Sequence, residues 1–177
     1  MDRYEVLLIA GRSGVGKSTV GWEVSVLLQA AGTAHCVIEG DLMDQIHPAP
    51  PDDPDRSAIT ERNLTAVWAN YAALGQRRLI YTNTVSVLEG PMFRRVLGAD
   101  VHIVPLLLTS DDATAHARLA VRETGSQWEA HVRRSDRMAR LLEQHAPPGT
   151  VRVATDGRSV TDIAREVVAV TGWCGRE

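Results

Sequence analysis

The 177-residue sequence has one lysine, two cysteines and one phenylalanine. Cys36 and Cys174 are too few for a disulfide framework and lack metal-site spacing, which predicts a reduced, cytoplasmic setting. The longest apolar runs, such as residues 104–108, are far shorter than a membrane span, and the charged N-terminus is not typical of a signal peptide. The net charge of −3 includes no basic excess, which disfavours nucleic acid as a partner.

The composition is otherwise that of a globular protein, with 44% hydrophobic and 23% charged residues. A chain of this length forms one domain, so residues 1–177 are predicted to be a single unit with a sizeable core. The single lysine, Lys17, stands beside 18 arginines. A bias toward arginine replaces lysine wherever the two residues are interchangeable. Lys17 therefore marks a place that needs a slim ammonium group.

Short apolar runs alternate with helical patterns along the whole chain. The predicted strands are residues 5–10, 34–39, 77–82, 101–108 and 151–155. Helices are predicted over about 17–31, 58–74, 90–97 and 111–122, with a last one after the capping box of Ser159 and Asp162. Pro105 should restrict pairing of its strand to one side at that point. This alternation predicts an α/β fold, a parallel sheet with helices on both faces.

Residues 11–18 match the phosphate-binding pattern G-x-x-x-x-G-K-[ST] (Walker A) without a mismatch. Glycines let successive backbone N–H groups surround an anion, and the helix that follows adds the positive end of its dipole. Lys17 can reach the β- and γ-phosphates, and the Ser18 hydroxyl can ligate Mg²⁺. The predicted nucleotide-binding residues are Gly11, Arg12, Ser13, Gly14, Val15, Gly16, Lys17, Ser18 and Thr19.

Asp41 follows an apolar run and the flexible Gly40, which predicts a carboxylate at the mouth of the cleft. There it could accept a proton from a substrate hydroxyl or hold Mg²⁺ through water, and it could also be a helix N-cap. Asp44 would lie one turn further along such a helix, as a candidate acceptor contact. Glu39 is expected to point to the opposite side.

Six arginines fall between residues 118 and 140, which we treat as a candidate lid region. They are Arg118, Arg122, Arg133, Arg134, Arg137 and Arg140. Guanidinium groups that turn inward neutralise the charge of a transferring phosphoryl group, and a closing segment excludes water. Most of the six are expected to form a solvated helix face. The catalytic candidates are Arg118 and Arg122, which are four residues apart and share a face.

The loop and helix of residues 48–74, with residue 83 after the third strand, should line the acceptor half of the cleft. Candidate acceptor contacts there are Arg56, Arg62, Asn63, Trp68 and Asn83, in addition to Asp44. Each has a structural alternative. Arg62 could face solvent, and Trp68 fits the core face of its helix.

Four segments together resemble a known group of enzymes. They are residues 11–18, Glu39-Gly40-Asp41, residues 106–122 with Arg118-Leu119-Ala120-Val121-Arg122, and residues 151–168. The chain resembles the small P-loop kinases, especially gluconate kinase, shikimate kinase, adenylylsulfate kinase and chloramphenicol phosphotransferase-like enzymes. The resemblance implies a five-stranded parallel sheet in the order 2-3-1-4-5 within three layers. It also implies ATP and Mg²⁺, with Asp41 near the acceptor hydroxyl and a lid bearing Arg118 and Arg122.

The sequence thus favours an ATP-dependent phosphotransferase that acts on a hydroxyl of a small molecule, either a metabolite or an antibiotic-like compound. One alternative is a P-loop ATPase or nucleotide-binding switch with a protein partner, although guanine-binding N-K-x-D and switch D-x-x-G motifs are absent. A further alternative is a nucleic-acid end kinase. The oligomeric state is left open.

Overall fold

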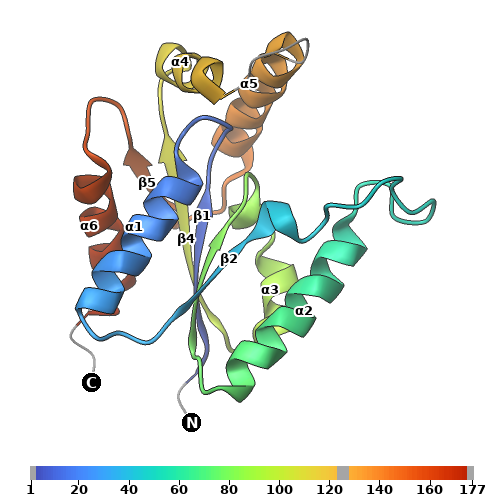
Figure 1. Ribbon diagram of the computed structural model, residues 1–177, viewed down its shortest axis with the longest axis vertical. Coiled ribbons are helices and arrows are strands. Elements are labelled where there is room, and N and C mark those ends of the chain that lie inside the picture. The colour runs from blue at the N-terminus through green and yellow to red at the C-terminus, as the bar shows by residue number, and fades with distance from the viewer. Residues whose placement is uncertain (1–2, 123–127, 175–177) are drawn as a thin grey trace.

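Five parallel strands form one sheet in the predicted order β2-β3-β1-β4-β5 (Figure 1). The computed structural model describes residues 3–122 and 128–174. The strands are β1 (Glu5–Ala10), β2 (Cys36–Glu39), β3 (Arg78–Thr82), β4 (His102–Thr109) and β5 (Val151–Ala154). Their short apolar runs suit burial on both faces of a parallel sheet. Because β1 lies between β3 and β4, the loop after β1 is at the topological switch point, where such sheets bind ligands.

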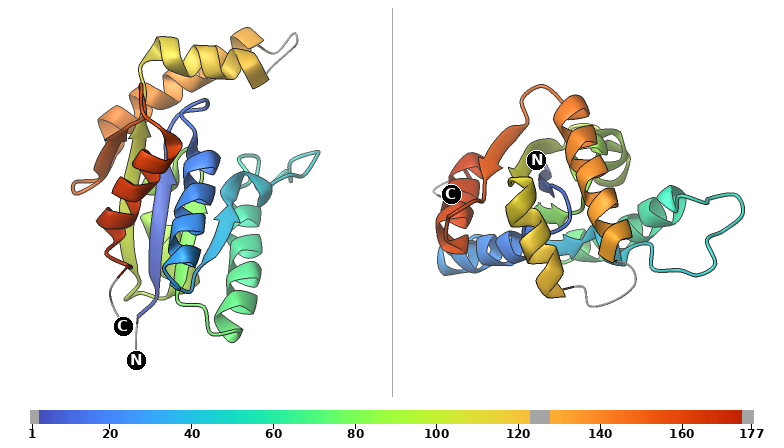
Figure 2. Two further views of the ribbon diagram at one scale, coloured as in Figure 1. Left: turned by 60° about the vertical axis from the view of Figure 1, so that its left-hand side comes forward. Right: turned by 90° about the horizontal axis from the view of Figure 1, so that it is seen from above.

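Helices cover both faces of the sheet, which confirms the predicted fold class (Figure 2). One face is covered by α1 (Lys17–Ala30) and α6 (Val160–Thr171), and the other by α2 (Ser57–Ala73), α3 (Gly90–Leu97) and α5 (Trp128–His145). Helix α4 (Asp112–Arg122) follows β4, and Figure 1 shows α4 and part of α5 beyond the end of the sheet where the loop after β1 lies. No helix in the described ranges is long and apolar enough to span a membrane.

Alternating side chains of the strands fill two cores, one on each side of the sheet. In β1, Val6 and Leu8 belong to the core under α2 and α3, whereas Leu7 and Ile9 belong to the core under α1 and α6. Trp68 lies in the first core, only 3% exposed, so its structural interpretation is confirmed. These two cores fix the strand ends, and therefore the loops that carry the site, relative to one another.

Two local predictions are also confirmed. Pro105 pairs with Leu8 of β1, and β5 begins only opposite Leu106, so the residue without an N–H has a strand partner on one side. Ser159 precedes α6, and its hydroxyl accepts a hydrogen bond from the Asp162 backbone N–H at 3.1 Å.

Tyr81 of β3 is fully buried, and its ring packs edge-to-face on Phe93 of α3 with centroids 4.9 Å apart. Its hydroxyl lies directly beneath Gly40, the first residue of the single-turn 3₁₀ helix η1 (Gly40–Leu42). A Cβ atom at residue 40 would overlap that hydroxyl and lie 2.9 Å from the Cβ of Asn83. Close packing therefore requires glycine at this position.

We predict that Gly40→Ala lowers the free energy of unfolding by on the order of 1–3 kcal/mol, because the added methyl group is forced into a filled space. Gly90→Ala is the matched control, since its nearest neighbour would be 3.8 Å away. Denaturant unfolding measures the free energy of unfolding of both variants. Equal stability of the two single variants would contradict the packing argument.

Candidate active site

A glycine-rich loop of residues 11–16 connects the carboxyl end of β1 to the first turn of α1. Gly11, Gly14 and Gly16 have positive φ angles of 149°, 86° and 100°. α1 begins at Lys17, directly after Gly16, so the free N–H groups of its first turn stand at the end of the loop. This is the backbone arrangement that binds phosphate at a helix N-terminus.

Helix α4 packs directly against this loop. A Cβ atom at Gly14 would lie 2.6 Å from the backbone carbonyl oxygen of Ala115 in α4, so only glycine allows the approach. Arg118 of α4 donates to the Val15 carbonyl at 3.3 Å and to the Thr155 hydroxyl at 3.0 Å. The structure thus places Arg118 beside the loop, between it and the end of β5.

Arg12 is predicted from the sequence as part of the nucleotide site, and its side chain is buried against α4 and α5. The guanidinium pairs with Asp112 of α4 and Asp136 of α5, and its Nε donates to the Ser135 hydroxyl at 2.9 Å. A hydrogen bond to His116 lowers the pKa of Asp136, with a smaller contribution from Arg12. Asp112, His116 and Asp136 are close enough to share a metal ion, but Arg12 already supplies the positive charge between the two carboxylates.

The two residues that follow Gly16 turn in different directions. The Lys17 ammonium group donates to the Arg12 carbonyl at 3.3 Å, so it lies over the loop. The Ser18 hydroxyl donates to Oε2 of Glu39 at 2.7 Å, and the Thr82 hydroxyl donates to the same oxygen at 3.3 Å. Glu39 was expected to point away from the site, and this expectation is wrong. Side chains alternate along β2, so Glu39 is on the same face as Val37, the face that α1 covers.

The pair formed by Ser18 and Glu39 offers a hydroxyl and a carboxylate oxygen side by side. Magnesium prefers oxygen ligands of this kind, so these residues fit the ion that the P-loop implies. Asp41, the other metal residue predicted from the sequence, instead accepts a hydrogen bond at Oδ1 from the Asn83 amide at 3.1 Å. Asp41 is inside η1, whose N-cap is Glu39, so the N-cap interpretation of Asp41 is wrong.

Asp41 and Asn83 thus come together at the adjacent ends of β2 and β3. The side-chain Oδ1 of Asn83 accepts from the Val85 backbone N–H at 3.1 Å, which fixes the orientation of the side-chain amide. Asp44 lies beyond the end of η1 and accepts from the Gln45 amide at 3.3 Å. The predicted continuation of a helix through Asp44 does not occur.

Two further polar groups of this region are not recognised from the sequence. Glu89, at the start of α3, has a buried Oε2 with no hydrogen-bond partner among the described residues, and the same is true of the Tyr81 hydroxyl. Burial, together with the charges of Asp41 and Asp44, raises the pKa of Glu89 to about 7. Burial and the charges of Glu89, Asp41 and Asp44 raise the pKa of Tyr81. Gly90-Pro91 in the sequence indicates the start of a helix, but it does not predict that Glu89 lies near Asp41 and Asp44.

The remaining acceptor candidates lie along α2 and the loop before it. Arg56 is the N-cap of α2, with a φ angle of 61°. Arg62 is exposed on α2, as its structural alternative predicted. The Asn63 amide donates to the Met43 carbonyl at 2.7 Å and so ties α2 to the segment that contains Asp41 and Asp44.

The predicted lid region is only partly described. The side chain of Arg122 and residues 123–127 lie outside the described residues. Four of the other arginines, all on α5, are exposed, as expected of a solvated helix face: Arg133, Arg134, Arg137 and Arg140. Arg133 forms an ion pair with Glu129 one turn away at 3.2 Å.

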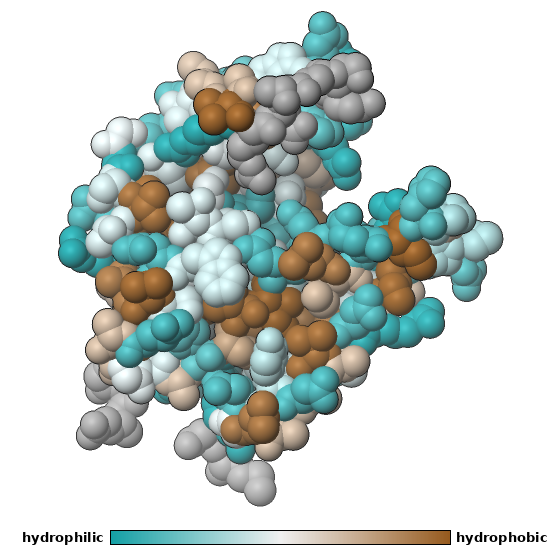
Figure 3. All heavy atoms as spheres, viewed as in Figure 1, coloured by the Kyte–Doolittle hydropathy of each residue, from teal (hydrophilic) through white to brown (hydrophobic). Residues whose placement is uncertain are grey.

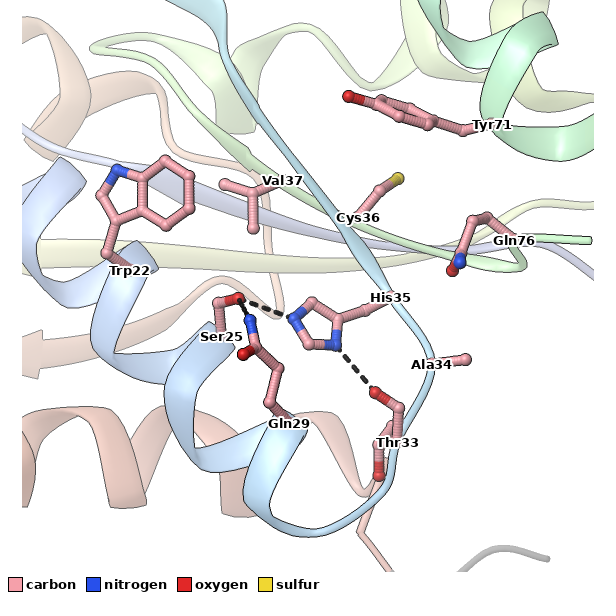
Figure 4. A pocket seen from close by; sticks show the side chains of 10 residues that line it. All are labelled: Trp22, Ser25, Gln29, Thr33, Ala34, His35, Cys36, Val37, Tyr71 and Gln76. Atoms are coloured by element: carbon pink, nitrogen blue, oxygen red, sulfur yellow. Dashed lines mark hydrogen bonds between the residues drawn. The ribbon is translucent and has the colours of Figure 1, made fainter. Parts of the chain in front are cut away.

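A separate hollow of about 400 Å³ follows the edge strand β2 between α1 and α2 (Figure 4). Its His35 ring lies between the Ser25 hydroxyl and the Thr33 carbonyl, both at 2.8 Å. Figure 3 shows apolar surface near this strand, where Trp22 and Val26 of α1 are more than half exposed. The α1 residues that line the hollow, Trp22, Ser25 and Gln29, are not among the loop residues 11–16 or the first turn of α1.

No protein-family model matches the chain, and no curated protein matches its sequence. Solved structures do match. A gluconokinase from Sinorhizobium meliloti 1021 is 18% identical with a TM-score of 0.59, covering 97% of this chain and 94% of that one. A tunicamycin resistance protein from Deinococcus radiodurans is 16% identical with a TM-score of 0.62 and 96% coverage of both.

The Mycobacterium tuberculosis APS kinase, solved in complex with AMPPNP and APS, is 20% identical with a TM-score of 0.60. That match covers 96% of this chain and 98% of the kinase. The chain therefore has the fold of the small P-loop kinases that its sequence resembles.

We predict that Glu89 makes the protein less stable as the pH rises. Its pKa is about 7 in the folded chain against an ordinary value of 4.5, so over that range the native state holds a proton that the unfolded chain has lost. Between about pH 5 and pH 8 this should remove up to about 3 kcal/mol of stability. The free energy of unfolding of Glu89→Gln should therefore be close to that of the unchanged protein at about pH 5 and higher than it at about pH 8.

Urea unfolding at the two pH values measures this difference. The control is Glu143→Gln on α5, whose side chain is 69% exposed and which should have the same effect at both pH values. A Glu89→Gln effect that does not change with pH would contradict the assignment.

Proposed function

We propose that this protein is an ATP-dependent kinase that transfers the γ-phosphoryl group of ATP to a hydroxyl group of a small molecule. The observation that carries the proposal is the convergence of two groups at one edge of the sheet. The P-loop with Lys17 follows β1, and the carboxylate of Asp41, held by Asn83, follows β2. The first group suits a nucleotide triphosphate, and the second suits an acceptor hydroxyl.

The backbone N–H groups of residues 11–18 bind the phosphates, and Lys17 places its charge on the β- and γ-phosphates. Ser18 and Glu39 would hold Mg²⁺, because their oxygens are paired in the structure. When bound, the ion supplies positive charge that neutralises phosphate oxygens. Asp41 remains available for the acceptor.

Asn83 engages only one oxygen of Asp41, so Oδ2 can accept the proton of the acceptor hydroxyl. The acceptor oxygen bonds to the γ-phosphorus as the bond from that phosphorus to the β–γ bridging oxygen breaks, and ADP leaves. Arg118, beside the loop, and Arg122 are the proposed sources of further positive charge. Residues 118–140 are proposed to act as a lid and residues 48–74 to line the acceptor side of a single domain.

The kinases with this fold support a small molecule as acceptor. One is a gluconokinase, and another was solved with AMPPNP and APS. The charge of −3 argues further against a nucleic-acid end. Acceptor-dependent release of ADP, with one phosphoryl group gained by the acceptor, tests the proposal, whereas hydrolysis independent of every acceptor would favour an ATPase.

We predict that Lys17→Ala reduces phosphoryl transfer by roughly 10²–10³-fold, because the charge on the transferring group loses its ammonium partner. Circular dichroism should show an unchanged fold, since Lys17 makes its described hydrogen bond within the loop. Lys17→Arg tests the need for a slim cation and should also be impaired. Full activity of Lys17→Ala would refute the assignment of the P-loop lysine.

We predict that Asp41→Asn lowers kcat more than it changes ATP affinity, because the amide cannot take the acceptor proton. Calorimetry measures ATP binding, and a coupled assay measures turnover. Asp100→Asn, an exposed change in the loop before β4, is the control and should leave both unchanged. A change in ATP affinity alone would show that Asp41 binds metal rather than the acceptor proton.

A further inference from the structure

The acceptor half of the site has an excess of negative charge. Asp41 and Asp44 follow the end of β2 and Glu89 precedes α3, and the charges of all three raise the pKa of the buried Tyr81. The chain contains no lysine or arginine from residue 18 to residue 55, the segment that supplies Asp41 and Asp44. Three carboxylates brought together repel one another unless a cation or a proton lies among them.

Two buried polar atoms of this region, one of them in Glu89 itself, have no hydrogen-bond partner among the described residues. Tyr81 is fully buried, and its hydroxyl lies beneath Gly40, the residue before Asp41. That hydroxyl has no hydrogen-bond partner among the described residues. Oε2 of Glu89 is likewise buried and unpartnered in the described part of the chain. A buried polar atom without a partner is costly, so native proteins satisfy it with a protein group, water or a ligand. Both atoms can accept a hydrogen bond, and both would be satisfied by a donor.

Nearby arginines are engaged with other acids. Arg95 of α3 holds Glu61 of α2 through two hydrogen bonds of 2.8 and 2.7 Å. Arg62 is beside Asp53, where it contributes to lowering the pKa of that aspartate after the hydrogen bonds from the backbone of α2. Arg95 and Arg62 are thus engaged with carboxylates other than that of Glu89.

We propose that the acceptor carries an ammonium group as well as its hydroxyl group, and that Glu89, Asp44 and the Tyr81 hydroxyl oxygen bind the ammonium group. This inference rests on the proposed kinase function. An ammonium group has N–H donors for several acceptors at once and a positive charge for the carboxylates. With the ammonium group there, the acceptor hydroxyl lies at Asp41. An amino alcohol or amino sugar has this chemistry, whereas a sugar acid would add negative charge to an acidic site.

The test uses three two-carbon hydroxyl compounds of matched size. Ethanolamine carries an ammonium group, ethylene glycol is neutral and glycolate is an anion. Each is titrated into the protein with Mg-AMPPNP, and NMR follows the backbone amide signals of Asp41, Asp44 and Glu89. Of the three compounds, we expect only ethanolamine to shift these amide signals saturably at millimolar concentrations. Its affinity should exceed that of ethylene glycol by about tenfold or more.

Glu89→Gln should weaken ethanolamine binding by about tenfold, while Glu143→Gln on α5 should not change it. The proposal is overturned if no compound gives a saturable shift, if the neutral or anionic compound binds as tightly, or if Glu89→Gln has no effect. It is also overturned if Mg²⁺ alone saturates the Glu89 signal, since the carboxylates would then form a metal site.

The same samples separate this proposal from the kinase function. Calorimetry with AMPPNP tests nucleotide binding without any acceptor, and its failure would refute the kinase while the ethanolamine titration without nucleotide still measures the subsite. If AMPPNP binds and ethanolamine does not, the kinase proposal stands and only the ammonium subsite is lost.

Discussion

The close contact between the P-loop and α4 is the constraint on which the rest of the site depends. Gly14 has no side chain, so the Ala115 carbonyl of α4 can approach the loop, and Arg12 extends from the loop to bind α4 and α5 together. A buried guanidinium between two carboxylates resists separation, because parting them would leave charges unpaired. The loop therefore stays attached to the parts of α4 and α5 that Arg12 and Gly14 contact.

The turn at the end of β2 then gives the two acidic residues different partners. Glu39 follows Val37 onto the face of α1 and meets Ser18, whereas Asp41 lies past the end of β2 and meets Asn83. Two carboxylates only two residues apart therefore lie in different surroundings, one beside the first turn of α1 and one beside the end of β3. Gly40 makes the turn between them possible, because nothing larger fits over Tyr81.

The two sides of the site differ in charge. The loop of residues 11–18 and Arg118 supply backbone N–H groups and cations, which suit phosphate, whereas the acceptor side gathers Asp41, Asp44 and Glu89 around a buried hydroxyl. A surface charged in this way attracts or repels a ligand according to the sign of the ligand's charge, whatever the ligand's shape. The solved structures with the same fold are 20% identical or less to this chain, so the fold alone does not determine the ligand.

Local patterns in the sequence predicted the strands, the glycine-rich loop and the helices other than α5, because apolar periodicity, glycine spacing and capping residues act over a few positions. The strand order came from the resemblance to known kinases. Only the tertiary structure decided that Arg12 would bind Asp136, 124 residues away, that Glu39 would meet Ser18, and that Glu89 would lie near Asp41. Such contacts depend on which faces of distant elements the two cores bring together, and no short window of sequence contains that information.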